Sequence, residues 1–184
     1  MKNFLSFSWE ILKIIIIALL IVIPIRYFLF QPFIVKGASM EPNFHSGDYL
    51  IIDEISYRFG EPQRGEVIVF RSPRDPSQRY IKRIIGLPDE TIEIKEGEIT
   101  VSRDSQTQVL DESPYLSDLL KVSGEHKVTL AENEYFVLGD NRSFSSDSRQ
   151  WGSLSKELII GKVFFRAWPP AAWAKIEVPA YQTL

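Results

Sequence analysis

The pattern of apolar and polar positions divides the chain into two parts. Residues 11–30 form an almost unbroken apolar run. From residue 32 onward, apolar residues come in short runs rich in Ile, Val, Phe and Tyr, a pattern typical of β-strands separated by turns. We therefore predict a mostly β protein, with a coiled antiparallel β-sheet domain over residues 32–184 behind an N-terminal helix in segment 1–31.

Nine runs in the second part are expected to be strands. They are 33–36, 48–53, 66–70, 79–85, 91–95, 98–102, 126–130, 134–138 and 158–166. Turn-forming pairs such as Gly47-Asp48 and Gly139-Asp140 separate them. No run between them is long and amphipathic enough to require a helix. The segment 103–125 is polar, contains Pro114, and is expected to be a long excursion from the sheet.

The apolar run is expected to be an uncleaved membrane anchor. A spanning helix needs about 20 mostly apolar residues, and 11–30 has that length with only two charges, Lys13 and Arg26. A cleavable signal peptide would have a shorter apolar core followed by small residues, whereas large residues follow here. Basic residues lie on both sides of the run, so the positive-inside rule does not give the orientation.

Composition narrows the possible chemistry. The net charge is −3 with both signs interspersed, which disfavours a nucleic-acid partner. There is no cysteine, so disulfides, thiolate catalysis and cysteine-ligated metals are excluded. His45 and His126 are the only histidines, and both are expected on the surface. We expect no metal and no cofactor.

Two residues could form a catalytic pair. Ser39 lies in GASMEP at 37–42, within ten residues of the end of the apolar run, and a serine hydroxyl becomes a nucleophile when a base takes its proton. Lys82 lies in the strand-like RYIKRII, on the same face as Tyr80 and Ile84. Apolar surroundings would lower the pKa of this lysine and allow it to act as a base. Taken alone, GASMEP could be a surface turn and Lys82 a surface lysine.

A third segment, GDNRSFSSDSRQWG at 139–152, is rich in polar groups. If it is extended, Asp147 and Arg149 lie on one side and can form a charge-assisted pair. Ser145 could exchange a hydrogen bond with an amine. The alternative is a solvated loop with an Asx-turn.

Together, GASMEP, RGEVIVF with RYIKRIIGLP, and GDNRSFSSDSRQWG resemble the ordered signature boxes of type I signal peptidases. The resemblance runs from about residue 9 to residue 168, and a single short domain is typical of bacterial enzymes, including the cyanobacterial and plastid kind. It implies a mostly β, membrane-bound endopeptidase with a Ser-Lys dyad. Such an enzyme removes signal peptides from exported preproteins on the extracytoplasmic side of the plasma or thylakoid membrane. The expected partners are preproteins and the lipid bilayer, and the protein is expected to be a monomer.

The resemblance also implies roles for individual residues. Ser39 matches the nucleophile and Lys82 the general base. Ser145 matches the hydroxyl that orients the lysine, and Asp147 with Arg149 matches a structural pair. The backbone N–H of Ser39 would contribute to the oxyanion hole. Substrate would be held as an added β-strand by residues of the strands leading to Ser39 and Lys82, namely Phe33, Ile34, Val35, Tyr80 and Ile81.

Three positions depart from the family pattern. Asn43 and Asp89 stand where threonine and glycine are usual, and both are expected to affect local turns. Gly37 stands where some members have a serine that serves as a second oxyanion donor, so this chain has no such side chain.

Two other functions are weaker candidates. A catalytically silent membrane-anchored homologue that binds peptides would tend to have lost Ser39, Lys82 or Ser145, and all three are present. A self-cleaving repressor would share the Ser-Lys pair but would need a DNA-binding helix pair in place of the anchor.

The run FFRAWPPAAW at 164–173 has two tryptophans, Trp168 and Trp173, which are expected at the membrane interface or packed on the β core.

Overall fold

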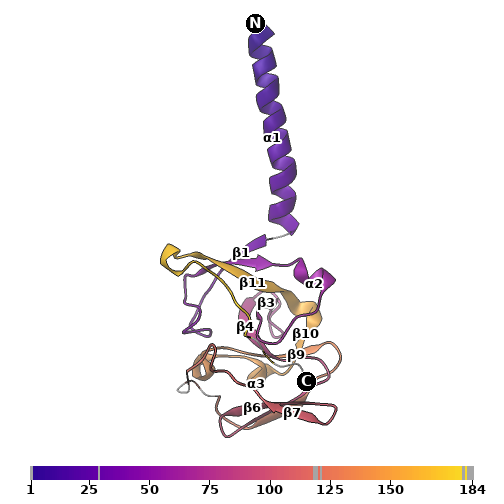
Figure 1. The fold of residues 1–184 in the computed structure, drawn as a ribbon, viewed down its shortest axis with the longest axis vertical. Helices are drawn as coiled ribbons and strands as arrows, with labels where there is room; N and C mark the ends of the chain where they lie inside the picture. Colours follow the sequence, from indigo (N-terminus) through magenta and orange to yellow (C-terminus); the bar gives the residue numbers. More distant parts are fainter. Residues whose placement is uncertain (1, 29, 118–119, 121, 180, 182–184) are drawn as a thin grey trace.

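The computed structural model describes residues 2–28, 30–117, 120, 122–179 and 181, with side chains omitted for 2–6 and 21–31. It contains two antiparallel sheets and one long N-terminal helix (Figure 1). The strands are β1 (Phe30–Ile34), β2 (Tyr49–Asp53), β3 (Val67–Arg71), β4 (Arg79–Gly86), β5 (Thr91–Lys95), β6 (Glu98–Arg103), β7 (Gln106–Val109), β8 (His126–Thr129), β9 (Glu134–Leu138), β10 (Leu154–Ser155), β11 (Ile159–Trp168) and β12 (Ala174–Lys175). The helices are α1 (Lys2–Phe28), α2 (Ser56–Phe59) and α3 (Ser148–Trp151), with 3-10 turns η2 (Arg142–Phe144), η3 (Lys156–Leu158) and η4 (Pro170–Ala172).

The larger sheet has eight strands in the order β1-β2-β11-β3-β4-β9-β10, with β12 paired to β11. The smaller sheet has four strands in the order β7-β6-β5-β8. The larger sheet changes register three times within its pairings of β11, and once between β4 and β9. Such irregularities bend and twist a strand. The expected mostly β, antiparallel fold is therefore confirmed, as a bent open sheet joined to a smaller one.

All nine expected strands are present, and their ends lie within two residues of the expected ones except at the start of β1, which begins at Phe30, three residues earlier than expected. The sequence analysis was wrong about part of segment 103–125, because residues 106–109 form β7 and pair with β6. Its sequence QTQV has little apolar alternation, since β7 is an edge strand that is largely exposed. Strands β10 and β12 have only two residues each, which is too short to show an alternation of apolar and polar residues.

Helix α1 extends away from the sheets, and its C-terminal end lies next to β1 (Figure 1). Among the side chains that the structure describes, no helix is both long and apolar enough to cross a membrane. The anchor expected at 11–30 lies partly outside the described side chains, which do not include those of residues 21–30.

Three groups of buried apolar side chains hold the β domain together, and one of them is formed by residues of β3, β4, β9 and β10. Another lies between the smaller sheet and β9, and includes Ile92, Val101 and Phe136. The third packs the first strands of the larger sheet and includes Met40 and Phe44, which belong to the loop between β1 and β2. That loop carries Ser39, so burial of its neighbours fixes the position of the serine relative to the sheet.

Candidate active site

Ser39 lies in a loop that is tied down at both ends and in the middle. The backbone N–H of Val35 donates to the Asp48 carbonyl at 3.0 Å, and the N–H of Gly47 donates to the Val35 carbonyl at 3.0 Å. Met40, the next residue after the serine, is completely buried. Ser39 itself is half-buried at the edge of an open groove.

Lys82 faces this serine from β4, in the middle of the larger sheet. The lysine is 4% exposed, and its Nζ atom lies 2.8 Å from Ser39 Oγ. A second hydrogen bond, also 2.8 Å long, joins Nζ to the carbonyl oxygen of Ile81. The ring of Tyr80 is 5.8 Å from the same nitrogen. The structure therefore brings together the two residues that the sequence analysis selected as a pair, although 43 positions separate them.

Burial changes the acidity of Lys82. Removing the ammonium from water lowers the pKa of Lys82 from 10.5 to about 8, and the carboxylates of Asp147 and Asp140 only partly oppose this. With a pKa of about 8, roughly a tenth of the lysine is neutral at pH 7, about 300-fold more than at 10.5. The lysine is therefore suited to accept a proton near neutral pH.

The third segment closes over the serine loop from the other side. The Asn141 backbone N–H donates to the Ser39 carbonyl at 3.1 Å, and its side-chain amide donates to the Ala38 carbonyl at 3.1 Å. Gly139 fits between the two segments because it has no side chain. A Cβ atom there would come closer than 3.0 Å to Ser145 and to the Ser39 carbonyl oxygen.

Ser145 is buried beside Gly139, but it makes no hydrogen bond to Lys82. Its hydroxyl makes the smallest of the contributions that lower the pKa of Asp147. It has no hydrogen-bond partner among the described groups. The partner of the lysine is instead the Ile81 carbonyl. The hydrogen bond from Ser145 to Lys82 that the expected orienting role requires is therefore not present among the described contacts.

Asp147 and Arg149 form an ion pair, with Arg149 Nε 2.8 Å from Asp147 Oδ1. The segment is not extended, as the sequence analysis supposed. Asp147 is instead the N-cap of α3, and its carboxylate accepts the backbone N–H of Arg149 as well as that of Gly139. Burial alone would raise the pKa of Asp147, but the hydrogen bonds from Arg149 and Gly139 and the charge of Arg149 together outweigh it, and the pKa is lowered. Asp147 thus stays ionised and ties Gly139 to α3.

The sequence analysis missed a second buried ion pair that joins β4 to this segment. Arg83, the residue after the lysine, donates two hydrogen bonds to Asp140 at 2.9 and 2.7 Å. Both side chains are almost completely buried, and the Arg83 guanidinium stacks 4.0 Å from the Tyr115 ring. Asn43 donates its amide to the same carboxylate at 2.9 Å. Arg83 and Asp140 are 57 residues apart, so no local pattern in the sequence could have identified the pair.

Arg166 on β11 braces the serine loop and was also missed. Its guanidinium donates to the Asn43 carbonyl, lies 3.3 Å from Asp48, and stacks 5.0 Å from the Phe44 ring. All three partners belong to the loop between β1 and β2. Arg166 therefore connects β11, which lies between β2 and β3 in the sheet, to the loop that carries Ser39.

The structure shows the local environment of all three positions that depart from the family pattern. Asp89 has a φ of 64°, a left-handed conformation that glycine adopts most easily. Asn43 is a member of the buried network rather than a turn residue alone, since its amide also donates to the Tyr115 carbonyl at 2.9 Å. Gly37 has a φ of 86°, so any residue with a side chain would be strained there.

An open groove of about 390 Å³ leads to Ser39. Its described lining residues are Phe33, Ile34, Lys36, Ser39, Gln78, Arg79, Tyr80, Ile81 and Lys82. Four of the five residues expected to hold substrate are among them. Val35 is the exception: its side chain is buried in the core, and both its backbone N–H and its carbonyl are used by Asp48 and Gly47.

The two strands beside this groove have free edges. Within the described residues, β1 pairs only with β2. The first half of β4 pairs with β3 on one side, whereas pairing with β9 begins only at Arg83. On this second side no described strand pairs with residues 79–82, although the Ile81 carbonyl accepts a hydrogen bond from Lys82 Nζ.

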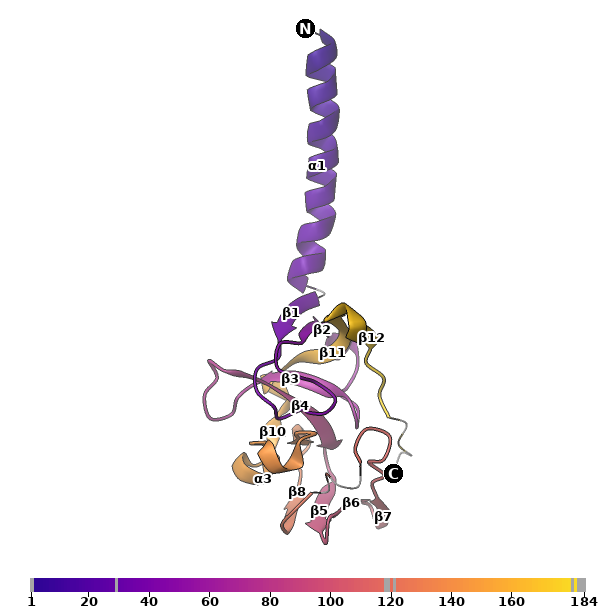
Figure 2. The same ribbon diagram turned by 90° about the vertical axis from the view of Figure 1, so that its left-hand side faces the viewer.

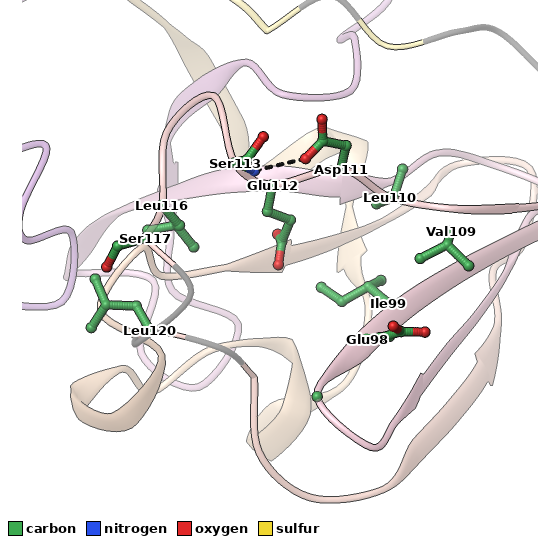
Figure 3. A pocket seen from close by; sticks show the side chains of 11 residues that line it. Glu98, Ile99, Val109, Leu110, Asp111, Glu112, Ser113, Leu116, Ser117 and Leu120 are labelled. Atoms are coloured by element: carbon green, nitrogen blue, oxygen red, sulfur yellow. Dashed lines mark hydrogen bonds between the residues drawn. The ribbon is translucent and has the colours of Figure 1, made fainter.

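The remaining candidate groups lie elsewhere. His45 is exposed, and His126 packs against Phe136 with ring centroids 5.4 Å apart. The described part of the chain has no cluster of three His, Cys, Asp or Glu side chains that could hold a metal ion. A second hollow of about 180 Å³ lies between β6 and the loop after β7, where Asp111 accepts the backbone N–H of Ser113 (Figure 3). Neither Ser39 nor Lys82 lines it.

Comparison with known proteins identifies the family. Residues 8–168 match the signal peptidase family, peptidase S26. The probable signal peptidase I-2 of Synechocystis is 37% identical over 169 residues, covering 88% of this chain and 74% of that protein. Signal peptidase I of Bacillus licheniformis is 34% identical over 178 residues, covering 91% of each chain. A crystal structure of a signal peptidase I from Enterococcus faecalis is 32% identical with a TM-score of 0.47, covering 56% of this chain and 97% of that one. The chain therefore belongs to the signal peptidase family, peptidase S26, which confirms the family and the enzyme class expected from its sequence.

Proposed function

We propose that this chain is a membrane-bound serine endopeptidase that removes signal peptides from exported preproteins by means of a Ser39–Lys82 dyad. The observation that carries the proposal is the 2.8 Å distance from Lys82 Nζ to Ser39 Oγ, which is within the range required for proton transfer. The buried position of the lysine supports it, because a neutral amine is needed for a base.

Acylation begins when the neutral Lys82 amine takes the proton of Ser39 Oγ as this oxygen attacks the carbonyl carbon of the scissile peptide bond. The tetrahedral intermediate carries a negative oxygen, which the backbone N–H of Ser39 would stabilise. The Lys82 ammonium then gives its proton to the departing amine, the C–N bond breaks, and the mature protein leaves. The signal peptide remains bound to Ser39 as an ester.

Deacylation repeats these steps with water. Lys82 takes a proton from a water molecule that attacks the ester carbonyl, and then returns it to Ser39 Oγ as the C–O bond breaks. The free signal peptide and the original serine are regenerated. Lys82 needs no charged partner for this cycle, and the Ile81 carbonyl holds its nitrogen near the serine in both steps.

Substrate is proposed to bind as an extended strand between β1 and β4. The free edges of these strands offer backbone N–H and carbonyl groups on either side of the groove. An extended peptide presents alternate side chains to the same surface. The family resemblance implies small residues at the first and third positions before the cut.

The proposal includes an anchor at residues 11–30, a catalytic domain at 32–184, and chemistry on the extracytoplasmic side of the membrane. The anchor rests on the apolar sequence of that segment. A second membrane contact is proposed at the turn between β11 and β12, where Trp168 is 57% and Trp173 is 64% exposed. This turn lies at the same end of the β domain as α1 (Figure 2).

The test is replacement of Ser39 by alanine in the full chain, in detergent, with a labelled preprotein as substrate. We expect cleavage to fall to the background rate while the thermal midpoint stays close to that of the wild type. Ser46→Ala is the matched control, since Ser46 is an exposed serine of the same loop, and it should stay active. Substantial cleavage by a folded Ser39→Ala protein would contradict the dyad.

The alternative, a silent homologue that binds signal peptides, is separated by the same experiment. A silent homologue would bind the labelled preprotein but leave it intact in the wild type as well as in the variant. Retention of both Ser39 and Lys82 at hydrogen-bond distance favours the enzyme.

A further inference from the structure

The groove that leads to Ser39 is lined by basic groups without a compensating acid. Of its described lining residues, Lys36, Arg79 and Lys82 are basic, and none is an aspartate or a glutamate. Lys82 is buried at the inner end, whereas Lys36 and Arg79 are exposed at the rim. Any charge preference of the groove therefore comes from the two rim residues.

Lys36 is the rim residue best placed to act on a bound peptide. It follows Ile34 on the exposed face of the segment, opposite the buried Val35, and lies three residues before Ser39. In the part of the chain that the structure describes, no ion pair with a carboxylate involves Lys36. Its charge is therefore free to interact with a ligand.

Arg79 adds to the same field, but its charge is partly compensated. It begins β4, three residues before Lys82, and lies near enough to the half-buried Glu54 to interact with its carboxylate. The rim of the groove thus carries one uncompensated positive charge close to the nucleophile and a second that is shared.

The geometry of an extended peptide places one side chain toward this rim. If the small side chains that the family resemblance implies at the first and third positions before the cut face the groove floor, alternation turns the side chain of the second residue outward. Resting on the proposed function, we propose that this protein prefers preproteins with an acidic residue at the second position before the cut, and that Lys36 is the residue that determines the preference. A carboxylate there would meet the ammonium of Lys36 at the groove rim.

The experiment uses three peptides that differ only at this position, with Glu, Gln or Lys between two alanines. The full-length wild type, in a nonionic detergent without lipid, should cleave them with kcat/KM in the order Glu, Gln, Lys. An exposed charge pair of this kind is expected to change kcat/KM by about threefold to tenfold between Glu and Lys. The difference should shrink between about 0.05 M and 0.5 M salt because the charges are exposed.

The decisive quantity is the ratio of kcat/KM for the Glu peptide to that for the Lys peptide within each variant, because this ratio does not depend on how much enzyme is active. Lys36→Gln should bring the ratio close to one, and Lys36→Glu should invert it. Lys95→Glu makes the same charge change on β5 of the other sheet and should leave the ratio as in the wild type.

The remaining outcomes overturn the inference in different ways. Equal ratios in wild type and Lys36→Glu, with all peptides cleaved, would refute the role of Lys36 and leave the proposed function intact. Failure of the wild type to cleave even the Gln peptide would refute the proposed function and the inference with it. A ratio that departs from one only when anionic lipid is added would assign Lys36 to contact with lipid headgroups and overturn its role in selecting substrates.

Discussion

Ser145 packs so closely against Gly139 that a single methyl group on the glycine would overlap the serine hydroxyl. The same methyl group would overlap the Ser39 carbonyl oxygen, which accepts the backbone N–H of Asn141. Gly139 is therefore the point at which the polar segment and the serine loop touch. Its position explains why the two signature boxes must fold together.

Gly139→Ala should push the serine loop away from Lys82. A displacement of about 1 Å at the reacting groups can cost about 100-fold in rate, and overpacking typically costs about 1–3 kcal/mol in stability. We expect both losses, measured as kcat/KM on a preprotein and as the free energy of unfolding in urea. Gly60→Ala is the control, because a methyl group on Gly60 would make only an ordinary contact, 3.6 Å from the Ser56 carbonyl oxygen. Equal effects of the two substitutions would contradict the close packing at Gly139.

Arg166 should act as a positioning residue for Ser39. Arg166→Met keeps much of the packing volume but removes the interactions with Asn43 and Asp48. We expect kcat/KM to fall by about tenfold, because the serine loop is less well fixed, while the pH at which activity rises stays unchanged. Arg166→Lys should restore part of the loss.

A control for Arg166 is Arg103→Met, which removes a surface ion pair with Asp89. Surface pairs contribute little, so this variant should resemble the wild type. If Arg166→Met left kcat/KM unchanged, or shifted the pH at which activity rises, the bracing role would be wrong.

The turn between β11 and β12 should touch the bilayer. In proteoliposomes of the full chain, lipids brominated near the headgroup should quench the emission of Trp168 and Trp173. The contribution of these residues is obtained by subtracting the emission of a Trp168→Phe/Trp173→Phe variant. Trp151→Phe serves as the control, since Trp151 packs against Phe70 inside the domain. If brominated lipids do not reduce the emission of Trp168 and Trp173, the contact with the bilayer is refuted.

Sequence reasoning was sufficient for nine of the twelve strands and for selecting Ser39 and Lys82 as candidates, because these leave local signals. Strands 79–86 and 134–138 are short apolar runs bounded by turns, and Lys82 is a charged residue inside one of them. The register that brings Lys82 to Ser39 depends on tertiary packing across the sheet and has no local signal. The same is true of Arg83 with Asp140, which are 57 residues apart.

The polar segment shows where local patterns mislead. Asp147 and Arg149 were correctly paired on chemical grounds, but through an assumed extended backbone. The actual geometry is a helix N-cap, and a helix of four residues is too short to show a hydrophobic period. Val35 was likewise assigned to the groove by its place in the strand, although its side chain and backbone are used by the core and the loop.

The central claim is that Lys82 is the base, and it depends on a lysine that loses its proton near neutral pH. Burial lowers the pKa of Lys82 to about 8, and the reactive form is the neutral amine. Activity must therefore be low below that pH and rise as the lysine is deprotonated. Lys82→Arg should be inactive, because arginine keeps its proton at every accessible pH.

The most direct measurement is the pH dependence of kcat/KM for a labelled preprotein between about pH 5 and 11, since kcat/KM reports ionisations of the free enzyme. Thermal melts at each pH identify the range in which the protein stays folded. The account predicts a rising limb centred near the Lys82 pKa of about 8, followed by a plateau, and no activity for Lys82→Arg at any pH. A limb centred near 10.5, the value of an ordinary exposed lysine, or an active Lys82→Arg protein, would contradict it.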